Sequence, residues 1–455
     1  MEIPQSTDVV IVGGGPSGVL AAIKIAKDGF GVVVFDKKKR EKIGNKSCGD
    51  ALDRVAPDLM KKELGIEYPH GDELPSRLEH LTFASLSLKN KLTAHTPAFI
   101  VHRLNYGQRL LRIAEENGAL IVGEAKVRDV IVEKDQIVGV KYFHDNQQKE
   151  IRSKIVIDAS GYVGTIRKLI PDQMKNGITY EVPPEHTVAT YREIIRLEHP
   201  HEFQEEIVLL YHDSIPIPGY AWIFTDGPKQ LNIGVTWPKH ISYPEGKSLK
   251  QIYHEVLDPL IDPNSYEVVH HGGGQIPIRP PFDSLVFNGA MLVGEAGCMV
   301  DPTTAEGHGP SLLSGYKAGV AAVKALQEGD VTEKGLWSYN KDIMTYPGST
   351  HGMSYQALQY LKAVGPKGMA FFLKRKVVTE EDLIELFQKR DFEFTFWMKV
   401  KKVLKVLPRI DYLFKLGKTI QKVELADKIY KNYPTSPDGL KEWIEWRKSA
   451  LTADY

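Results

Sequence analysis

The chain has 455 residues, and its 58 lysines and arginines are balanced by 58 aspartates and glutamates, so the formal net charge is zero. This balance gives no reason to expect a nucleic-acid partner, and two cysteines are too few for the disulfide framework of a small secreted protein. No stretch approaches the roughly twenty apolar residues of a membrane-spanning helix. We also expect no signal peptide, because a strand pattern begins a few residues after Met1 without a preceding charged region.

The first forty residues have the pattern of a dinucleotide-binding unit. In order, they predict a strand at 9–12, a G-x-G-x-x-G turn at 13–18, a helix at 19–26 and a strand at 32–35. Gly13 permits the tight turn, Gly15 lets the backbone approach a pyrophosphate, and Gly18 lets helix and strand pack closely. The helix N-terminus offers free N–H groups to the phosphates, and Asp36 can accept hydrogen bonds from ribose hydroxyls. The pattern alone does not distinguish FAD from a nicotinamide dinucleotide.

Strands and helices alternate through the next part of the chain. The sequence predicts strands at 78–88, 92–101, 127–132, 137–143 and 151–159, with a helix at 103–117. Residues 178–285 are rich in strand-forming residues without a long helical pattern, which indicates a separate antiparallel sheet. A short buried strand at 290–293 precedes a helix at 310–327, and the chain from 335 onward is helical.

These elements predict an α/β fold, α+β overall, in which a β-rich insertion interrupts a Rossmann-type domain. We assign 1–76, 102–177 and 286–334 to the dinucleotide-binding domain. Residues 77–101 and 178–285 form the antiparallel-sheet substrate domain, and 335–455 form the helical C-terminal region. In a simple nicotinamide-dependent dehydrogenase, the dinucleotide-binding domain would be more contiguous in the sequence.

Two later segments also have features of a cofactor site. Arg103 begins a helix directly after a strand, where its planar fork of donors can reach phosphate or ribose oxygens; the alternative is a solvated helix residue. Glu295 follows a buried strand and can bind a ribitol hydroxyl. The glycine loop at 307–309 then opens a helix at Pro310, whose positive dipole end can face an electron-rich flavin edge. The alternative is an ordinary tight loop between strand and helix.

At this point the sequence resembles a known family. The opening unit, Arg103, residues 158–161 and the segment 294–310 are similar to the FAD-dependent group that includes p-hydroxybenzoate hydroxylase. Within it, Lys46-Ser47-Cys48-Gly49-Asp50 resembles the Cys-Gly loop of the geranylgeranyl reductases, and Tyr220-Ala221-Trp222-Ile223-Phe224 resembles their aromatic substrate motif. The likeness covers roughly residues 8–330 and is greatest to archaeal members that act on membrane lipids. Thr225 stands where the family's motif has proline, and Gly234-Val235-Thr236 replaces a G-x-G.

The resemblance implies FAD as cofactor and the reduction of C=C bonds in geranylgeranyl chains by hydride transfer from reduced flavin. It implies a polyprenyl lipid substrate and either NAD(P)H or a ferredoxin as electron donor. The implied cofactor-binding residues are Gly13, Gly15, Pro16, Ser17, Gly18, Asp36, Lys37, Ser47, Cys48, Gly49, Arg103, Ala125, Asp158, Gly161, Glu295, Gly307, His308 and Gly309. Two alternatives remain, an aromatic monooxygenase of the same superfamily and a non-enzymatic prenyl-binding protein.

Three side chains near the expected flavin have more than one interpretation. Cys48 and Cys298 lie in loops that both approach the flavin, so they either form a disulfide or are two small buried hydrophobic residues. Cys48 is also a candidate catalytic residue that lines the site or helps to deliver a proton. His308 is a second catalytic candidate, with a structural role in its loop as the alternative. The fifteen histidines have no metal-ligand spacing, and we expect no metal site.

Alternating aromatic residues are the candidate substrate wall. Tyr220, Trp222 and Phe224 project to one face of a strand. They are either sheet core or the wall of a tunnel for a long apolar chain. Tyr211, Ile215 and Ile217 are expected to extend such a wall.

A basic segment near the C-terminus is the candidate membrane contact. Residues 394–422 interleave lysines with large apolar side chains, as in an amphipathic helix that ends at Pro408. Such a helix lies on an anionic membrane surface or packs on the protein body with its charges in solvent. Lys374 and Arg375 are candidate contacts to a lipid headgroup. The expected location is the cytoplasmic side of a membrane, bound peripherally.

Overall fold

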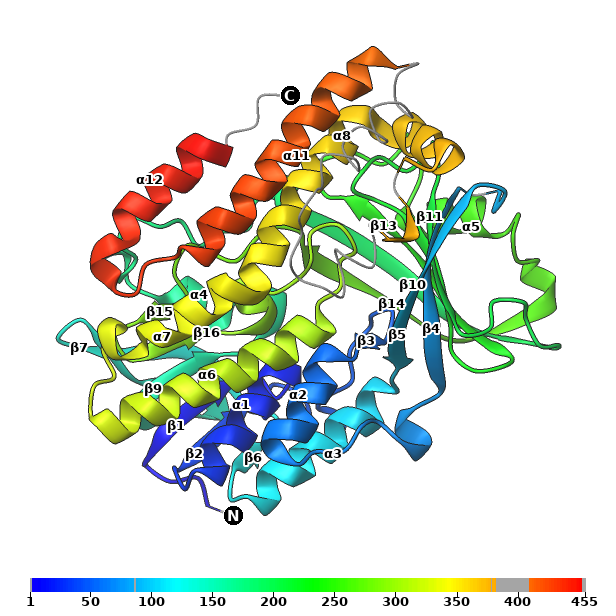
Figure 1. Cartoon of the computed structure of the whole chain (residues 1–455). Helices are drawn as coiled ribbons and strands as arrows, with labels where there is room; N and C mark the ends of the chain where they lie inside the picture. Colours follow the sequence, from blue (N-terminus) through cyan, green and yellow to red (C-terminus); the bar gives the residue numbers. More distant parts are fainter. Residues whose placement is uncertain (1, 86, 378, 382–408, 452–455) are drawn as a thin grey trace.

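The computed structural model describes residues 2–85, 87–377, 379–381 and 409–451, and it has the expected α/β architecture (Figure 1). Two eight-stranded sheets lie side by side. Helices from the N-terminal part pack against the first sheet, and the C-terminal helices extend across both parts. Within the described residues, no helix is long and apolar enough to cross a membrane.

The first sheet is mainly parallel and holds the Rossmann-type elements. Its strand order is β15-β16-β9-β1-β2-β6. Outside this order, β8 pairs with both β9 and β7. The strands are β1 (Ser6–Val12), β2 (Val32–Phe35), β6 (Leu120–Val122), β7 (Lys126–Glu133), β8 (Gln136–His144), β9 (Gln147–Asp158), β15 (Val286–Phe287) and β16 (Ala290–Leu292). β2 has the predicted bounds. The predicted hairpin is also present, and its turn is tight because Lys134 and Asp135 both have positive φ.

Helices cover this sheet because their apolar faces match its buried valine and isoleucine side chains. They are α1 (Pro16–Lys27), α2 (Val55–Leu64), α3 (Arg103–Glu116), α4 (Thr165–Leu169) and α6 (His308–Glu328). α1 packs against both α3 and α6. α6 begins two residues before the predicted start at Pro310.

The second sheet is mainly antiparallel, as expected, with β11 and β4 as a parallel pair. Its order is β14-β10-β13-β12-β11-β4-β5-β3. The strands are β3 (Ala51–Asp53), β4 (Ser76–Ser85), β5 (Lys91–Ile100), β10 (Thr187–Leu197), β11 (Glu206–Tyr211), β12 (Ala221–Thr225), β13 (Gln230–Pro238) and β14 (Tyr266–Pro277). β3 lies within residues 1–76, so pairing crosses the boundary that we placed at residue 76. The short helix α5 (Leu249–Leu257) also lies in the region expected to be strand-rich without a long helix.

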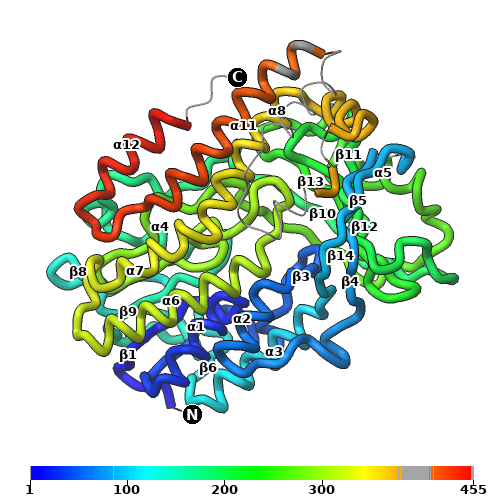
Figure 2. Tube along the Cα trace, in the orientation of Figure 1, coloured from blue at the N-terminus to red at the C-terminus, as the bar shows by residue number. Residues whose placement is uncertain are grey.

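The C-terminal region is helical, with α7 (Glu333–Ile343), α8 (Ser349–Arg375), α11 (Ile410–Lys431) and α12 (Leu440–Leu451). α8 and α11 run along each other, and together they bridge the two sheets (Figure 2). α8 bends at Gly365-Pro366, where glycine has a φ of 66° and proline cannot continue the hydrogen bonding. The predicted basic helix that ends at Pro408 lies outside the described residues, and the rest of the basic segment, 409–422, falls mainly in α11.

Candidate functional site

The glycine turn has the shape that a dinucleotide needs. Gly13 has a φ of +110°, and a Cβ at Gly18 would lie 1.9 Å from the carbonyl oxygen of Gly13, so the turn and the helix contact permit only glycine. A Cβ at Gly15 would meet no atom within 4 Å, which leaves room for a phosphate to approach the backbone. α1 begins at Pro16 without a side-chain cap, so the N–H groups of its first turn are open to a ligand. This cradle fits a dinucleotide pyrophosphate.

Asp36 lies at the end of β2, where the sequence places the ribose ligand. Its Oδ2 accepts a hydrogen bond from the Gly14 N–H at 2.9 Å, and its Oδ1 accepts one from the Lys38 N–H at 2.8 Å. Ala125 lies beside it and donates its N–H to the Asp36 carbonyl at 2.9 Å. The neighbouring Lys37 side chain is exposed. The backbone therefore fixes this carboxylate next to the glycine turn.

Arg103 is buried rather than solvated, and it connects the start of α3 to the Cys-Gly loop. Its Nη1 donates a hydrogen bond to Cys48 Sγ at 2.8 Å. The thiol in turn donates to Asp50 Oδ1 at 3.0 Å. Burial raises the pKa of Cys48, and this effect exceeds the opposing effect of the Arg103 charge. The thiol is thus protonated at neutral pH and held between a cation and a carboxylate.

Glu295 faces the same space from the end of the first sheet. Its Oε1 forms an ion pair with Lys46 Nζ, and its Oε2 accepts a hydrogen bond from the Tyr162 N–H at 3.2 Å. Gly161 adjoins this carboxylate. Cys298 is fully buried, and both cysteines are free thiols in the structure, so the disulfide alternative is not supported.

Asp158 has a position that the sequence interpretation did not anticipate. Its carboxylate is fully buried and accepts hydrogen bonds from Ser160 N–H at 3.0 Å, Ser160 Oγ–H at 2.6 Å and Arg167 N–H at 2.8 Å. These protein donors orient the turn after β9. The side chain does not line the cavity described below, so we correct its expected role from cofactor ligand to support of this turn.

The start of α6 lies opposite the glycine turn. Gly307 is the residue before the helix, and the carboxylate of the preceding Glu306 accepts a hydrogen bond from the Gly309 N–H at 2.8 Å. His308 is 93% buried, packs edge-on against Tyr106 with 6.1 Å between ring centroids, and has an Nδ1 without a hydrogen-bond partner among the described residues. Burial, followed by the charge of Arg103, lowers the pKa of His308 well below its usual value. The imidazole is therefore neutral and is a poor proton donor at neutral pH.

A cavity of about 960 Å³ joins these loops to the second sheet. One part is lined by Pro16, Cys48, Arg103, Glu295, Gly307, His308 and Pro310, and the other by Leu81, Ile207, Leu209, Tyr220, Trp222 and Phe224. Ser47 and Gly49 also line it. Asp36 and Ala125 lie outside this lining, beside the glycine turn. The cavity thus brings eight of the eighteen predicted cofactor residues and the aromatic motif to one space, while the glycines of the turn at 13–18 do not line it.

The aromatic residues form one continuous wall. Ring centroids are 6.4 Å apart between Tyr220 and Trp222, and 6.2 Å apart between Trp222 and Phe224. Trp222 Nε1–H donates to Asn232 Oδ1 at 3.1 Å. A Cβ at Gly234 would lie 2.3 Å from Trp222 Cζ2. The absence of a side chain at Gly234 on the neighbouring strand therefore leaves the space that the indole ring occupies.

The predicted extension of this wall is only partly present. Tyr211 and Ile217 belong to the same apolar cluster, and the Tyr211 ring lies 6.4 Å from that of Tyr220, but neither residue lines the cavity. Ile215 packs in the cluster on the other side of the sheet, so its expected role is wrong. Lys374 and Arg375 are exposed at the end of α8 and do not line the cavity.

Several residues at or beside the cavity were missed because no motif marks them. Arg192 on β10 is 95% buried, and its Nη1 lies 3.5 Å from Asp50 Oδ2. Asn232 donates through Nδ2 to Asp50 Oδ2 and to the Cys48 carbonyl, both at 2.9 Å. Glu306 immediately precedes the α6 loop, and burial, followed by the charge of Asp53, raises its pKa well above the usual value. Only the position of Asp50 in the Cys-Gly loop offered a signal in the sequence.

Comparison with known proteins agrees with this geometry. Residues 8–165 match a family model described as FAD dependent oxidoreductase. The chain is 28% identical over 448 residues to the digeranylgeranylglycerophospholipid reductase of Sulfolobus acidocaldarius, covering 98% of this chain and 97% of the relative.

Two solved structures show the same fold. A geranylgeranyl bacteriochlorophyll reductase-like protein from Thermoplasma acidophilum superposes with a TM-score of 0.74 at 18% identity, covering 93% of this chain and 99% of the other. A flavin-dependent brominase variant superposes with a TM-score of 0.64 at 19% identity, covering 97% and 100%. The resemblance found in the sequence is confirmed, and the chain is an FAD-dependent oxidoreductase similar, over nearly its whole length, to the digeranylgeranylglycerophospholipid reductases.

Proposed function

We propose that this protein is an FAD-dependent reductase that saturates C=C bonds in the geranylgeranyl chains of a glycerolipid or of geranylgeranyl diphosphate. The observation that carries this proposal is the cavity of about 960 Å³, because it joins the Cys-Gly loop and Pro16, at the edge of the dinucleotide cradle, to an aromatic wall. Ligand sites are typically apolar with a few placed polar groups. The similarity to reductases of this class over 98% of the chain supports the same function.

The proposed cofactor residues divide into two groups by position. The turn at 13–18, with Asp36 and Ala125, holds the adenosine and pyrophosphate part, because it combines free N–H groups with a fixed carboxylate. Arg103, Glu295 and the loop at 307–309 face the shared cavity and hold the flavin part. When bound and reduced, FAD supplies a hydride to the alkene.

The aromatic wall is proposed to position the polyprenyl chain. An unactivated alkene has no carbonyl to polarise, so the protein contributes mainly by alignment and by excluding water. Trp222 is fixed by Asn232 and packed over Gly234, which gives the wall a defined shape. Successive reductions require the chain to slide or to rebind.

We propose Cys48 as the group that delivers the proton to the second alkene carbon. Its thiol is protonated, lines the cavity and is hydrogen-bonded to Asp50. Asp50 and solvent at the cavity mouth can return the proton. His308 does not suit this role, since its low pKa keeps it neutral.

The electron donor and the membrane contact are further parts of the proposal. NAD(P)H binding transiently, or a reduced ferredoxin, would reduce the flavin. The basic segment at 394–422 would hold the protein on the anionic cytoplasmic face of a membrane. Sedimentation with anionic vesicles tests this contact, and charge reversal by Lys401→Glu and Lys402→Glu should reduce it. Equal sedimentation of both forms would contradict the membrane proposal.

The reaction is tested by anaerobic incubation of the reduced, FAD-loaded protein with a geranylgeranyl glycerolipid, followed by mass spectrometry. We expect the lipid mass to rise in steps of two hydrogen atoms, and the oxidised protein serves as the control. An unchanged lipid with fully reduced flavin would reject the proposed reaction. A gain of one oxygen atom in the presence of air would instead favour the monooxygenase alternative.

A further inference from the structure

The Cys-Gly loop needs a second source of protons if a lipid chain is reduced more than once without leaving the protein. The thiol of Cys48 lines the larger cavity, so a chain that fills this cavity separates the thiol from the solvent at its mouth. Each further reduction then requires a proton from another direction. The need arises within the proposed function, in which Cys48 is the proton donor.

An exposed histidine on the edge strand β14 lies beside this loop. Gly272 pairs with Arg192 of β10, and His270 is two residues away on the same strand, so the three positions share one face of the sheet. Ser47 Oγ occupies the space that a side chain at Gly272 would take, and His270 Cε1 lies 3.6 Å from the same point. The serine hydroxyl and the imidazole are therefore within reach of one bridging water molecule.

Ser47 connects this point to the thiol. It directly precedes Cys48, and both residues line the larger cavity, whereas His270 does not. A hydroxyl group accepts one hydrogen bond while it donates another, so it can pass a proton on. The three residues thus lead from the exposed edge of the second sheet to the thiol.

The charges around His270 favour release of its proton toward the loop. Burial, followed by the charges of Arg192 and His271, lowers the pKa of His270. Asp50 acts on it in the opposite direction and does not cancel this effect. Burial raises the pKa of the Cys48 thiol, which makes the thiolate a strong proton acceptor. Transfer of a proton from the imidazolium to the thiolate is therefore favourable.

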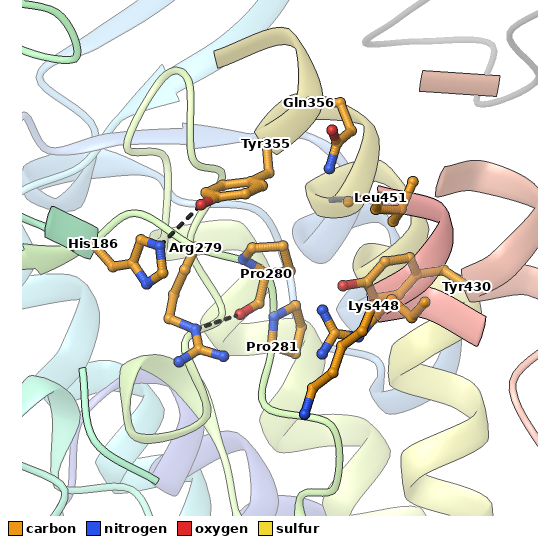
Figure 3. A pocket seen from close by; sticks show the side chains of 11 residues that line it. His186, Arg279, Pro280, Pro281, Tyr355, Gln356, Tyr430, Lys448 and Leu451 are labelled. Carbon is orange, nitrogen blue, oxygen red and sulfur yellow. Dashed lines mark hydrogen bonds between the residues drawn. The ribbon is translucent and has the colours of Figure 1, made fainter. Parts of the chain in front are cut away.

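Three other histidines at the cavities are less suited to this task. His186 lies in a separate cavity of about 320 Å³ beside the C-terminal helices, where its Nε2 is hydrogen-bonded to the Tyr355 hydroxyl at 2.9 Å (Figure 3). His308 and His351 line the larger cavity and are more than 90% buried, so a bound lipid would separate them from solvent as it does the thiol. His270 is exposed and lies outside that lining.

We propose that His270 takes protons from solvent and returns them through Ser47 to Cys48. In each reduction, the S–H bond of Cys48 breaks and a C–H bond forms on the second alkene carbon. An N–H bond of the protonated imidazole then breaks, the S–H bond forms again by way of the serine hydroxyl, and His270 regains a proton from water. The path moves one proton per double bond and consumes no oxidant or reductant. His270 acts through Ser47 and Cys48 and is not itself a catalytic residue.

The test measures exchange of the Cys48 thiol hydrogen in the FAD-loaded protein after transfer to D2O. The infrared S–H band of Cys48 is assigned by its loss in Cys48→Ala, and a saturated isoprenoid glycerolipid is added to fill the cavity. We expect His270→Gln to slow the exchange about a hundredfold, because positioned acids and bases typically accelerate proton transfer by this much or more. Free imidazole should restore the rate.

Two further variants make the measurement specific to this path. His271→Gln is the matched control, because His271 is also exposed on β14 but pairs with Glu193 on the opposite face of the sheet; its exchange rate should equal that of the wild type. Ser47→Ala should slow the exchange, and the double variant with His270→Gln should be no slower than the slower single variant, since both changes interrupt one path.

Three results would overturn the proposal. The first is exchange in His270→Gln as fast as in the wild type. The second is slowing that His271→Gln shares or that imidazole fails to reverse, because the effect would then come from the strand and not from one imidazole group. The third is unchanged exchange in Ser47→Ala. Reduction of an unsaturated lipid is measured separately by its mass, so exchange that depends on His270 in a protein that reduces no lipid would support the proton path and reject the proposed function.

Discussion

The buried pair of Asp50 and Arg192 gives a prediction whose size can be worked out. Both side chains are more than 90% buried, and Arg192 Nη1 lies 3.5 Å from Asp50 Oδ2. Arg192→Met keeps most of the apolar stem but removes the charge, so Asp50 retains only Asn232, Cys48 and the more distant Arg103 as compensation. Removing one partner of a buried ion pair typically costs about 3–5 kcal/mol.

Protonation of Asp50 limits this cost and makes it depend on pH. Neutralising an aspartate with an ordinary pKa of about 3.9 costs about 1.4 kcal/mol per pH unit, hence about 4 kcal/mol at pH 7 and about 1.5 kcal/mol at pH 5. Burial already raises the pKa of Asp50 in the folded protein, and loss of Arg192 raises it further. Because the folded-state pKa lies above the unfolded one, the destabilisation appears above the unfolded pKa and grows with pH.

The assay compares denaturant midpoints of the FAD-loaded variants at pH 5 and pH 7. Arg192→Met should lose up to about 4 kcal/mol at pH 7 and clearly less at pH 5. The double variant Asp50→Asn with Arg192→Met should recover most of the loss, and Arg196→Met, an exposed residue on the same strand paired with Glu267, should cost less than about 1 kcal/mol. An equal loss at both pH values, or no recovery in the double variant, would refute a charge effect and leave lost packing as the cause.

Three further predictions concern positions where the structure leaves little freedom. Gly18→Ala should abolish flavin retention, because its Cβ would lie 1.9 Å from a backbone oxygen, whereas Gly15→Ala should preserve the fold and weaken FAD binding alone. Flavin retention is measured by absorbance after gel filtration. Gly234→Ala should displace Trp222, and the overpacking should lower the free energy of unfolding by about 1–3 kcal/mol. We expect a lower melting temperature and a higher KM for the lipid. An unchanged KM would contradict the proposed role of the aromatic wall. Asp158→Asn should lower the melting temperature, since the amide group cannot accept all three donors. Its FAD affinity should stay near wild type, because the carboxylate is hydrogen-bonded to Ser160 and Arg167 and supports the turn.

The sequence predicts the elements whose signals are local, and it misses contacts that depend on how distant elements meet. β2 has the predicted bounds because its four residues are all apolar and are followed by Asp36. α5 also carried a local signal that we did not use, a capping box in which Ser248 and Gln251 bind each other's backbone N–H groups. By contrast, Arg192 and Asn232 reach Asp50 only because the second sheet places β10 and β13 against the Cys-Gly loop. No spacing in the sequence encodes that contact.

The register of the second sheet connects the Cys-Gly loop to the aromatic wall. Trp222 pairs with Gly234, and Gly234 pairs with Arg192 on the next strand, so these three positions form one row on the cavity face. Asn232 lies on the same face and is fully buried. It accepts from the Trp222 indole and donates to the Cys48 carbonyl and Asp50. A shift of the aromatic wall therefore alters the hydrogen bonds of the loop that carries the proposed proton donor, which links substrate position to proton delivery through one amide side chain.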